Sequence, residues 1–382
     1  MPLPLPDHAA LAVSQRLTQQ IVRSINDQQG WIDFAQYMAL ALYASELGYY
    51  SAGSIKFGAA GDFVTAPEMT PLFGRTLARQ VAQIVTLTQG DVLEAGAGSG
   101  ALAGQLLTEL AVLDALPRQY YILEVSADLR VRQQQHLQAC VPELMHRVVW
   151  LDALPDTITG CVLGNELLDA MPVHVLHWYN GDVLERGVGW HDNQFVWQER
   201  PLQTGVLREA ALSVPVTGEY VSEINLVGQA WVSTLAQRLT RGALLLIDYG
   251  FGEREYYHPQ RQQGSLACHY RQHVHDDPFF LPGLQDITAH VDFTAVAVAG
   301  LQAGLKLAGF TTQAQFLINC GMTALLEQMS PEKPAAYLPQ VAAVQQLMSP
   351  AEMGELFKVI ALTRGLNEPL LGFVQGDQRR RL

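Results

Sequence analysis

Short apolar runs alternate with amphipathic stretches along the middle of the chain. Strands are expected in DVLEAGAG (91–98), YYILEVS (120–126), VVWL (148–151) and CVLGNELLD (161–169), with helices between them at about 100–111 and 126–138. This alternation predicts right-handed crossovers and a mainly parallel, doubly wound α/β sheet. The run GALLLIDYG (242–250) is continuously apolar up to Asp248, so we expect a central strand that is buried on both faces.

Helices should precede and follow this alternating region. Apolar side chains recur at helical spacing in residues 11–26 and 33–47, and Pro71 is expected to open a helix that runs to about residue 85. The end of the chain predicts a helix to about 308, a strand at 311–318, two further helices and a last strand in LFKVIALT (356–363). The strand count is then seven.

The pattern divides the chain into two parts. Residues 1–88 are expected to form a helical region that includes a long Gly-rich loop before Pro71, and residues 89–382 are expected to form the core. The core is expected to carry insertions at about 172–230 and 251–292, the first of them hairpin material with Asn180-Gly181 as its turn. A loop as long as the Gly-rich one usually has a function.

Composition narrows the class of protein. The 382 residues are 49% hydrophobic and 16% charged, which is typical of a globular chain. The formal net charge of -13 disfavours nucleic acid as a partner, and the basic run at 379–381 is interpreted as a solvated tail. The cysteines are scattered, no apolar run reaches the ~20 residues of a membrane span, and the start of the chain shows no targeting pattern. These features predict a cytoplasmic protein with no membrane span.

The first strand runs into a glycine-rich turn, Glu94-Ala95-Gly96-Ala97-Gly98-Ser99-Gly100. Glycines allow a sharp turn and a close approach of the backbone to a ligand. The motif also fits a dinucleotide site or a turn without a ligand. Glu124 ends the second strand, where a carboxylate can accept hydrogen bonds from the ribose of either adenosylmethionine or NAD.

Two features favour a sulfonium cofactor over NAD. Glu94 precedes the first glycine, where its charge suits the amino end of a methionine better than a diphosphate. Asn165, Glu166 and Asp169 follow the fourth strand, at the sheet edge where open α/β sheets bind ligands. Helix capping is the alternative interpretation of this polar group.

An ordered set of motifs extends over about residues 17–364 and resembles the MidA-like methyltransferase family. The set is Gly48-Tyr49-Tyr50, Gly61-Asp62-Phe63-x-Thr65-Ala66-Pro67-Glu68, Glu94-x-Gly96-x-Gly98-x-Gly100, Asn165-Glu166-Leu167-Leu168-Asp169-Ala170-x-Pro172, Asp248-Tyr249-Gly250, His290-Val291-Asp292-Phe293 and Gly354-Glu355-Leu356-Phe357-Lys358-Val359. Eukaryotic members of that family are mitochondrial arginine methyltransferases that assist assembly of respiratory complex I.

The resemblance implies a Rossmann-like, seven-stranded class I methyltransferase core with an N-terminal helical extension and inserted segments. It also implies S-adenosyl-L-methionine as the cofactor and protein arginine as the acceptor. By the same resemblance Glu94, Gly96, Gly98 and Gly100 hold the methionine end and Glu124 the ribose, while Asp62, Phe63, Thr65, Pro67 and Glu68 close over the cofactor.

The catalytic residues follow from the chemistry of the acceptor. A guanidinium is nucleophilic only when a carboxylate pulls its positive charge onto the other nitrogens, so Glu166 and Asp169 are the first candidates, with Asn165 positioning the acceptor. Asp248, Tyr249, His290 and Asp292 form a second group. His290 would instead act as a general base toward a lysine or hydroxyl acceptor.

Three further hypotheses complete the prediction. His269, His273 and His275 could be metal ligands, but a polar loop is the simpler interpretation, and we predict no metal. The long insertions favour a protein acceptor, with a respiratory-complex subunit and a homodimer among the candidate partners. The alternatives are an NAD(P)-dependent oxidoreductase and an assembly or scaffold protein that retains the cofactor pocket.

Overall fold

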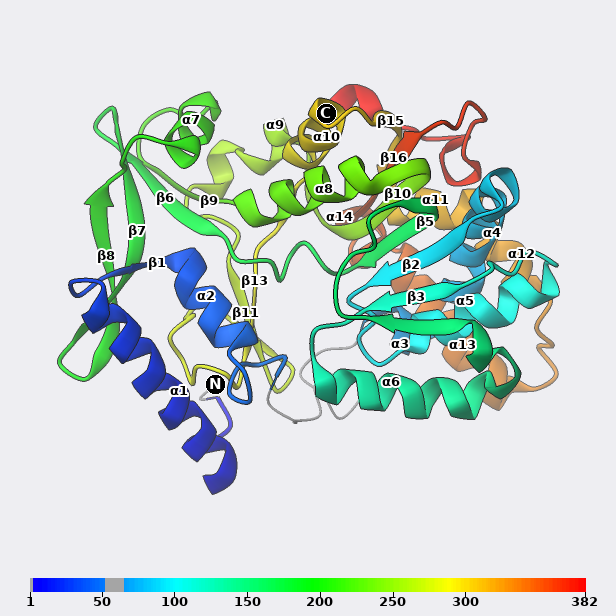
Figure 1. The fold of residues 1–382 in the computed structure, drawn as a ribbon, viewed down its shortest axis with the longest axis horizontal. Coiled ribbons are helices and arrows are strands. Elements are labelled where there is room, and N and C mark those ends of the chain that lie inside the picture. Colours follow the sequence, from blue (N-terminus) through cyan, green and yellow to red (C-terminus); the bar gives the residue numbers. More distant parts are fainter. Residues whose placement is uncertain (1–2, 52–64) are drawn as a thin grey trace. The chain divides into compact units, whose positions relative to one another are not determined.

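The computed structural model describes residues 3–51 and 65–382. These residues form two compact units, and each is built from segments that are far apart in the sequence (Figure 1). The sheet unit contains the described residues of 64–168, 231–252 and 293–382, and the insertion unit contains those of 1–63, 169–230 and 253–292. The chain therefore divides differently from the predicted boundary at 88/89, because the helices within residues 8–43 group with both inserted segments and those within 66–88 belong to the sheet unit.

The sheet unit is organised around strands that follow the order β15-β16-β10-β5-β2-β3-β4. Their bounds are β2 (Asp91–Ala95), β3 (Tyr120–Leu123), β4 (Val148–Leu151), β5 (Ile158–Asn165), β10 (Leu239–Phe251), β15 (Lys306–Thr312) and β16 (Phe357–Arg364). The strands from β10 to β4 are parallel, whereas β16 is antiparallel to both of its neighbours.

The register aligns the carboxyl ends of β2, β3 and β5, and Ile247 of β10 lies level with them. Ala95 is opposite Leu123 in β3 and Gly164 in β5, and Asn165 is opposite Ile247 in β10. Residues that directly follow these strands therefore lie along one edge of the sheet, which is where ligands of open α/β sheets bind.

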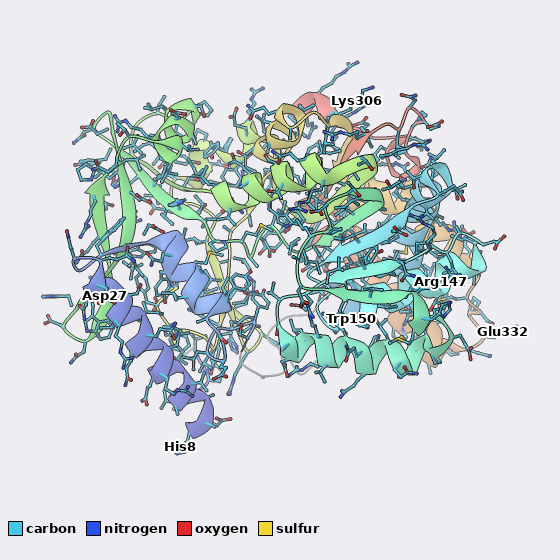
Figure 2. The ribbon with its side chains drawn as sticks, viewed as in Figure 1. His8, Asp27, Arg147, Trp150, Lys306 and Glu332 are labelled. Carbon is cyan, nitrogen blue, oxygen red and sulfur yellow. The ribbon has the colours of Figure 1, made fainter. Side chains whose placement is uncertain are left out.

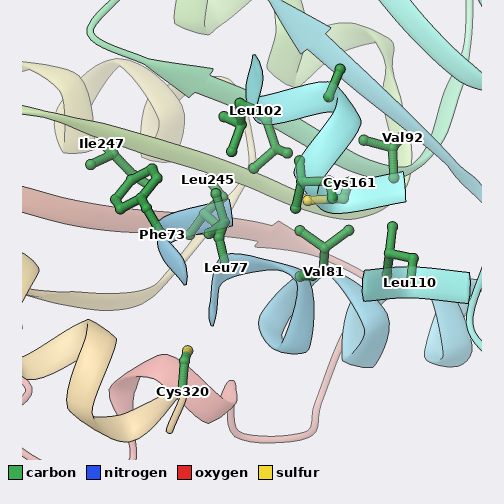
Figure 3. Packing of buried hydrophobic residues seen from close by; sticks show 14 of the residues in the cluster. Phe73, Leu77, Val81, Val92, Leu102, Leu110, Cys161, Leu245, Ile247 and Cys320 are labelled. Carbon is green, nitrogen blue, oxygen red and sulfur yellow. The ribbon is translucent and has the colours of Figure 1, made fainter. Parts of the chain in front are cut away.

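Helices complete this unit. They are α3 (Ala66–Met69), α4 (Pro71–Thr88), α5 (Ala101–Val112), α6 (Ala127–Cys140), the last part of α8 (Leu226–Arg238), α10 (Phe293–Gln302), α11 (Gln313–Asn319), α12 (Met322–Glu327), α13 (Pro334–Met348) and α14 (Met353–Leu356). Figure 3 shows Leu77 and Val81 of α4 and Leu102 of α5 packed near Val92, Cys161 and Leu245 of the strands. Burial of such side chains contributes about 1.5–3 kcal/mol each.

One strand near the C-terminus was predicted in the wrong place. The expected strand at 311–318 is β15 at Lys306–Thr312, and α11 begins at Gln313. Thr312 caps that helix through its side chain, which accepts a hydrogen bond from the Gln315 amide. A capping threonine ends the strand and starts a helix, although the following residues have apolar character that suits either.

The insertion unit contains two sheets and its own core. Its helices are α1 (His8–Asp27), α2 (Phe34–Tyr43), α7 (Val206–Ser213) and α9 (Glu253–Tyr256). One sheet has β1 (Ile32–Asp33), β6 (His174–Tyr179), β7 (Asp182–His191), β8 (Gln194–Pro201) and β9 (Tyr220–Ile224); the other has β11 (Ala267–Tyr270), β12 (His273–His275) and β13 (Asp286–Thr288), and β14 (Val291–Asp292) ends the unit. The predicted hairpin is confirmed, because Asn180 and Gly181 both have positive φ between β6 and β7.

Candidate active site

The glycine-rich turn connects β2 to α5 at the aligned edge of the sheet. Gly96, Gly98 and Gly100 have φ values of 68°, 54° and 86°, a backbone region that side-chain-bearing residues rarely adopt. Gly100 precedes the first residue of α5, so the amides of that helix begin at the turn. Glycine at these three positions leaves no Cβ beside the backbone, which fits the close approach of a cofactor.

Glu124 directly follows β3 and is 6% exposed. Its Oε1 accepts a hydrogen bond from the Ser126 amide at 2.9 Å, and its Oε2 accepts one from Gln133 Nε2 at 3.0 Å. Burial raises the pKa of this carboxyl above its ordinary value, while the hydrogen bonds oppose the increase. The carboxylate is therefore held in one orientation beside the glycine-rich turn, as a ribose acceptor has to be.

Glu94 is a buried carboxyl within β2, only 2% exposed. Tyr120 Oη donates to its Oε2 at 2.6 Å. Burial raises the pKa of Glu94 from 4.5 to about 7, the hydrogen bond from Tyr120 works in the opposite direction, and the nearby charge of Glu124 adds to the increase. Because the folded pKa lies above 4.5, the stability that the protonated form contributes is present at low pH and is lost as the pH rises through about 7.

The short helix α3 is fastened to the glycine-rich turn. Glu68 Oε1 accepts a hydrogen bond from Ser99 Oγ, and the carbonyl of Pro67 accepts one from Gln105 Nε2 of α5 at 2.7 Å. Thr65 is the residue before α3, although its side chain makes no capping hydrogen bond. Glu68 therefore contacts the turn and Pro67 contacts α5, whereas Asp62 and Phe63 lie outside the described residues.

Asn165 and Glu166 form a turn at the carboxyl end of β5. Asn165 Nδ2 donates to Glu166 Oε1 at 3.0 Å, and the Ala66 amide donates to the same oxygen at 3.4 Å. Within the described part of the chain, Asn165 Oδ1 is buried and accepts no hydrogen bond. A buried acceptor is costly without a donor, so this oxygen fits a donor from a bound molecule.

The alternative interpretation, in which Asn165, Glu166 and Asp169 only cap a helix, is wrong. Residues 165–172 are described and contain no helix, and Glu166 has a positive φ of 50°. Asp248, 1% exposed, fixes the turn, because its Oδ2 accepts hydrogen bonds from the amides of Leu167 and Leu168 at 3.1 and 2.8 Å. Asp248 was expected in the second acceptor group, but these bonds show that its carboxylate holds the backbone.

Asp169 and His290 belong to the insertion unit. Asp169 is 6% exposed, and its carbonyl accepts a hydrogen bond from the Ala289 amide at 3.0 Å. Burial raises the pKa of Tyr50, and the charge of Asp169 adds to the increase. The amide of His290 donates to Ser265 Oγ at 3.1 Å. Their predicted catalytic roles stay predictions.

Histidines of β11 and β12 have local partners. His273 Nδ1 pairs with the Arg271 carbonyl at 2.8 Å, and His275 Nδ1 accepts a hydrogen bond from the Asp277 amide at 3.3 Å. Among the described residues, the side chains whose ligand atoms converge are instead Asp33, His174 and Glu185. Asp33 already caps α2, and His174 Nδ1 pairs with Glu185 at 2.8 Å. The prediction of no metal remains untested.

Sequence reasoning missed Gln133 and Tyr120, which hold the two carboxyls in place. A signal was present for Gln133, because Leu129, Gln133 and Leu137 recur at four-residue spacing and therefore share the buried face of α6. Tyr120 opens a strand and has no such signal, since aromatic residues at strand starts are common in cores.

Comparison with known proteins matches residues 76–311 to a family described as "Putative S-adenosyl-L-methionine-dependent methyltransferase". A protein from Burkholderia thailandensis that was crystallised with S-adenosyl-homocysteine is 47% identical, with a TM-score of 0.97 over 100% of both chains. A native crystal structure from the same organism is also 47% identical, with a TM-score of 0.94 over 100% of both chains.

Curated relatives extend the comparison to animals. The mitochondrial protein arginine methyltransferase NDUFAF7 homolog of Drosophila melanogaster is 30% identical over 90% of this chain and 85% of its own length. Human mitochondrial protein arginine methyltransferase NDUFAF7 is 28% identical over 87% of this chain and 80% of its own. The predicted cytoplasmic location is wrong by this comparison, since these relatives are named mitochondrial proteins. None of the described helices has the length and apolar character needed to cross a bilayer.

Proposed function

This chain belongs to the S-adenosyl-L-methionine-dependent methyltransferase family, and we propose that the methyl acceptor of this transferase is an arginine side chain of a protein. Its cofactor is S-adenosylmethionine, as predicted, and the bound S-adenosyl-homocysteine of the 47% identical structure supports this. The class I methyltransferase fold agrees with the mixed sheet. The oxidoreductase and scaffold alternatives are not favoured by any of these relatives.

The cofactor supplies an electrophilic methyl group, and transfer requires the nucleophile to be aligned with it at roughly 3–3.5 Å. We assign the glycine-rich turn and Glu94 to the methionine end and Glu124 to the ribose. Thr65, Pro67 and Glu68 would cover the site, together with Asp62 and Phe63. The positive-φ glycines and the fixed Glu124 carboxylate support this assignment, because they offer a backbone cradle beside an oriented acceptor.

Glu166 carries the proposal for the acceptor. Its carboxylate follows β5 at the ligand edge of the sheet, and its Oε1 accepts hydrogen bonds from Asn165 Nδ2 and the Ala66 amide, which fix its position. A carboxylate that pairs with a guanidinium draws positive charge toward the paired nitrogens and leaves another nitrogen more nucleophilic. Asp169 would assist, and His290 would serve as a base only for a different acceptor.

The acceptor class can be tested with tritiated S-adenosylmethionine and a library of arginine- and lysine-containing peptides. We expect label in methylarginine after acid hydrolysis of the product. Label in methyllysine, or in a base-labile ester, would overturn the arginine proposal while leaving the methyltransferase assignment intact. A respiratory-complex subunit as substrate and a homodimer remain predictions.

Cofactor affinity should depend on pH through Glu94. A methionine ammonium beside Glu94 favours the ionised carboxyl, so a carboxyl with a pKa of about 7 has to release its proton on binding. We expect the affinity for S-adenosyl-homocysteine to rise about tenfold from pH 6 to pH 8 and then level off. Calorimetric titration across this range measures it.

Two variants show whether the pH dependence of the affinity comes from Glu94 or from Glu124, the other carboxyl that titrates. Glu94→Gln should give an affinity that is nearly flat between pH 6 and pH 8, because the titrating group is gone. Tyr120→Phe removes the hydrogen bond that favours the ionised form, so its profile should shift to higher pH. If the affinity of wild type did not change between pH 6 and pH 8, the assignment of Glu94 to the methionine end would be wrong.

A further inference from the structure

Gln133 is a fully buried amide in the middle of α6, with 0% exposure. It lies between Leu129 and Leu137 on the buried face of the helix, where apolar side chains would pack without any cost of desolvation. A buried amide is destabilising unless its hydrogen-bonding atoms find partners. The partners of Gln133 therefore indicate why an amide is in this position.

Each polar atom of Gln133 has a defined role. Its Nε2 donates to the Gly98 carbonyl at 3.0 Å and to Glu124 Oε2 at 3.0 Å. Its Oε1 accepts a hydrogen bond from Trp150 Nε1 of β4 at 3.0 Å; Trp150 is labelled in Figure 2. An indole N–H only donates, so Trp150 forces Oε1 to face β4 and directs Nε2 toward the turn and the carboxylate.

We infer that Gln133 is a positioning residue that holds the glycine-rich turn and the Glu124 carboxylate in fixed relation. The turn contains three positive-φ glycines and few side chains of its own, and Gln133 supplies a donor to its carbonyl at Gly98. Gly100 packs closely on the same residue, since an added Cβ would lie 3.3 Å from Gln133 Cα.

The effect on Glu124 is one of orientation. The Ser126 amide holds Oε1 and Gln133 holds Oε2, so the plane of the carboxylate is fixed before a ligand binds. A preorganised acceptor loses less entropy when it pairs with the two ribose hydroxyls. This inference rests on the proposed assignment of Glu124 to the ribose, and it predicts that Gln133 acts on the ribose end of the ligand.

The affinities of two proteins for two ligands test the inference. The ligands are S-adenosyl-homocysteine and its 2′-deoxyribose analogue, which lacks one hydroxyl, and the proteins are wild type and Gln133→Met. We expect Gln133→Met to weaken binding of S-adenosyl-homocysteine about 10- to 100-fold. The deoxy analogue should lose several-fold less, because the interaction that Gln133 organises is partly absent from it. Isothermal titration calorimetry gives all four affinities.

Two further variants keep the test decisive. Leu137→Ala removes apolar contacts on the same face of α6, and it should lower the melting temperature without changing the ratio of the two affinities. Trp150→Phe removes the donor that orients the amide, and we expect a smaller loss in the same direction as Gln133→Met. If Gln133→Met does not fold, Trp150→Phe carries the comparison.

The outcomes are distinguishable. If wild type discriminates between the two ligands and Gln133→Met discriminates equally well, the ratio of the two affinities is unchanged, as for Leu137→Ala. Glu124 then keeps its role, Gln133 is an ordinary core amide, and the inference is overturned. If wild type binds both ligands equally, the ribose assignment fails, and the inference fails with it.

Discussion

Glu166→Gln is expected to reduce methyl transfer about 1000-fold while S-adenosyl-homocysteine binds within about twofold of wild type. Glutamine keeps the shape of the side chain and an oxygen for the Asn165 and Ala66 donors, so the turn after β5 should survive. It has no negative charge, however, and cannot polarise a guanidinium. The initial rate with a peptide acceptor and the calorimetric affinity for S-adenosyl-homocysteine measure the two quantities.

The control for this variant is Glu327→Gln, which changes an exposed glutamate of α12 in the same unit. It should leave both the rate and the affinity unchanged. If Glu166→Gln lost both properties together, Glu166 would be a cofactor residue or a structural one. If the rate were unchanged, the acceptor would be held by other carboxylates, and the proposed clamp would be wrong.

The sheet could be predicted because periodicity reports burial directly. The run at 242–247 is apolar throughout because β10 is a central strand between β5 and β16, and burial of its side chains on both faces leaves no polar alternation. The glycine-rich turn was equally visible, because glycine adopts the positive φ found at 96, 98 and 100 far more readily than other residues. These features are local, so a single stretch of sequence reveals them.

The remainder of the site depends on contacts between distant segments. Asp248 was expected in the second acceptor group, yet its side chain accepts hydrogen bonds from the amides of Leu167 and Leu168, which only the register of β5 and β10 brings within reach. Asp169 follows Glu166 by three residues but belongs to the insertion unit. The spacing of residues in the sequence does not determine to which of the two units a residue belongs.

Glu124→Ala is expected to weaken S-adenosyl-homocysteine binding about 100-fold, the second large effect. Two hydrogen bonds from ribose hydroxyls to a charged acceptor contribute about 1.5–3 kcal/mol each, part of which is offset by water that enters the vacated site. The mutation also leaves Gln133 Nε2 with one partner fewer inside the protein. Calorimetry with S-adenosyl-homocysteine measures the loss, and Glu143→Ala, an exposed change in the segment after α6, is the matched control.

The affinity for the 2′-deoxyribose analogue distinguishes a ribose contact of Glu124 from a purely structural role. If Glu124 binds the hydroxyls, Glu124→Ala should bind S-adenosyl-homocysteine and its 2′-deoxyribose analogue with nearly equal affinity, because the group that discriminates them is absent. If Glu124 only supports the fold, the preference of wild type would persist in the variant at a lower melting temperature. Its two fixed oxygens favour the first result, since a carboxylate that served packing alone would gain nothing from an oriented plane beside the glycine-rich turn.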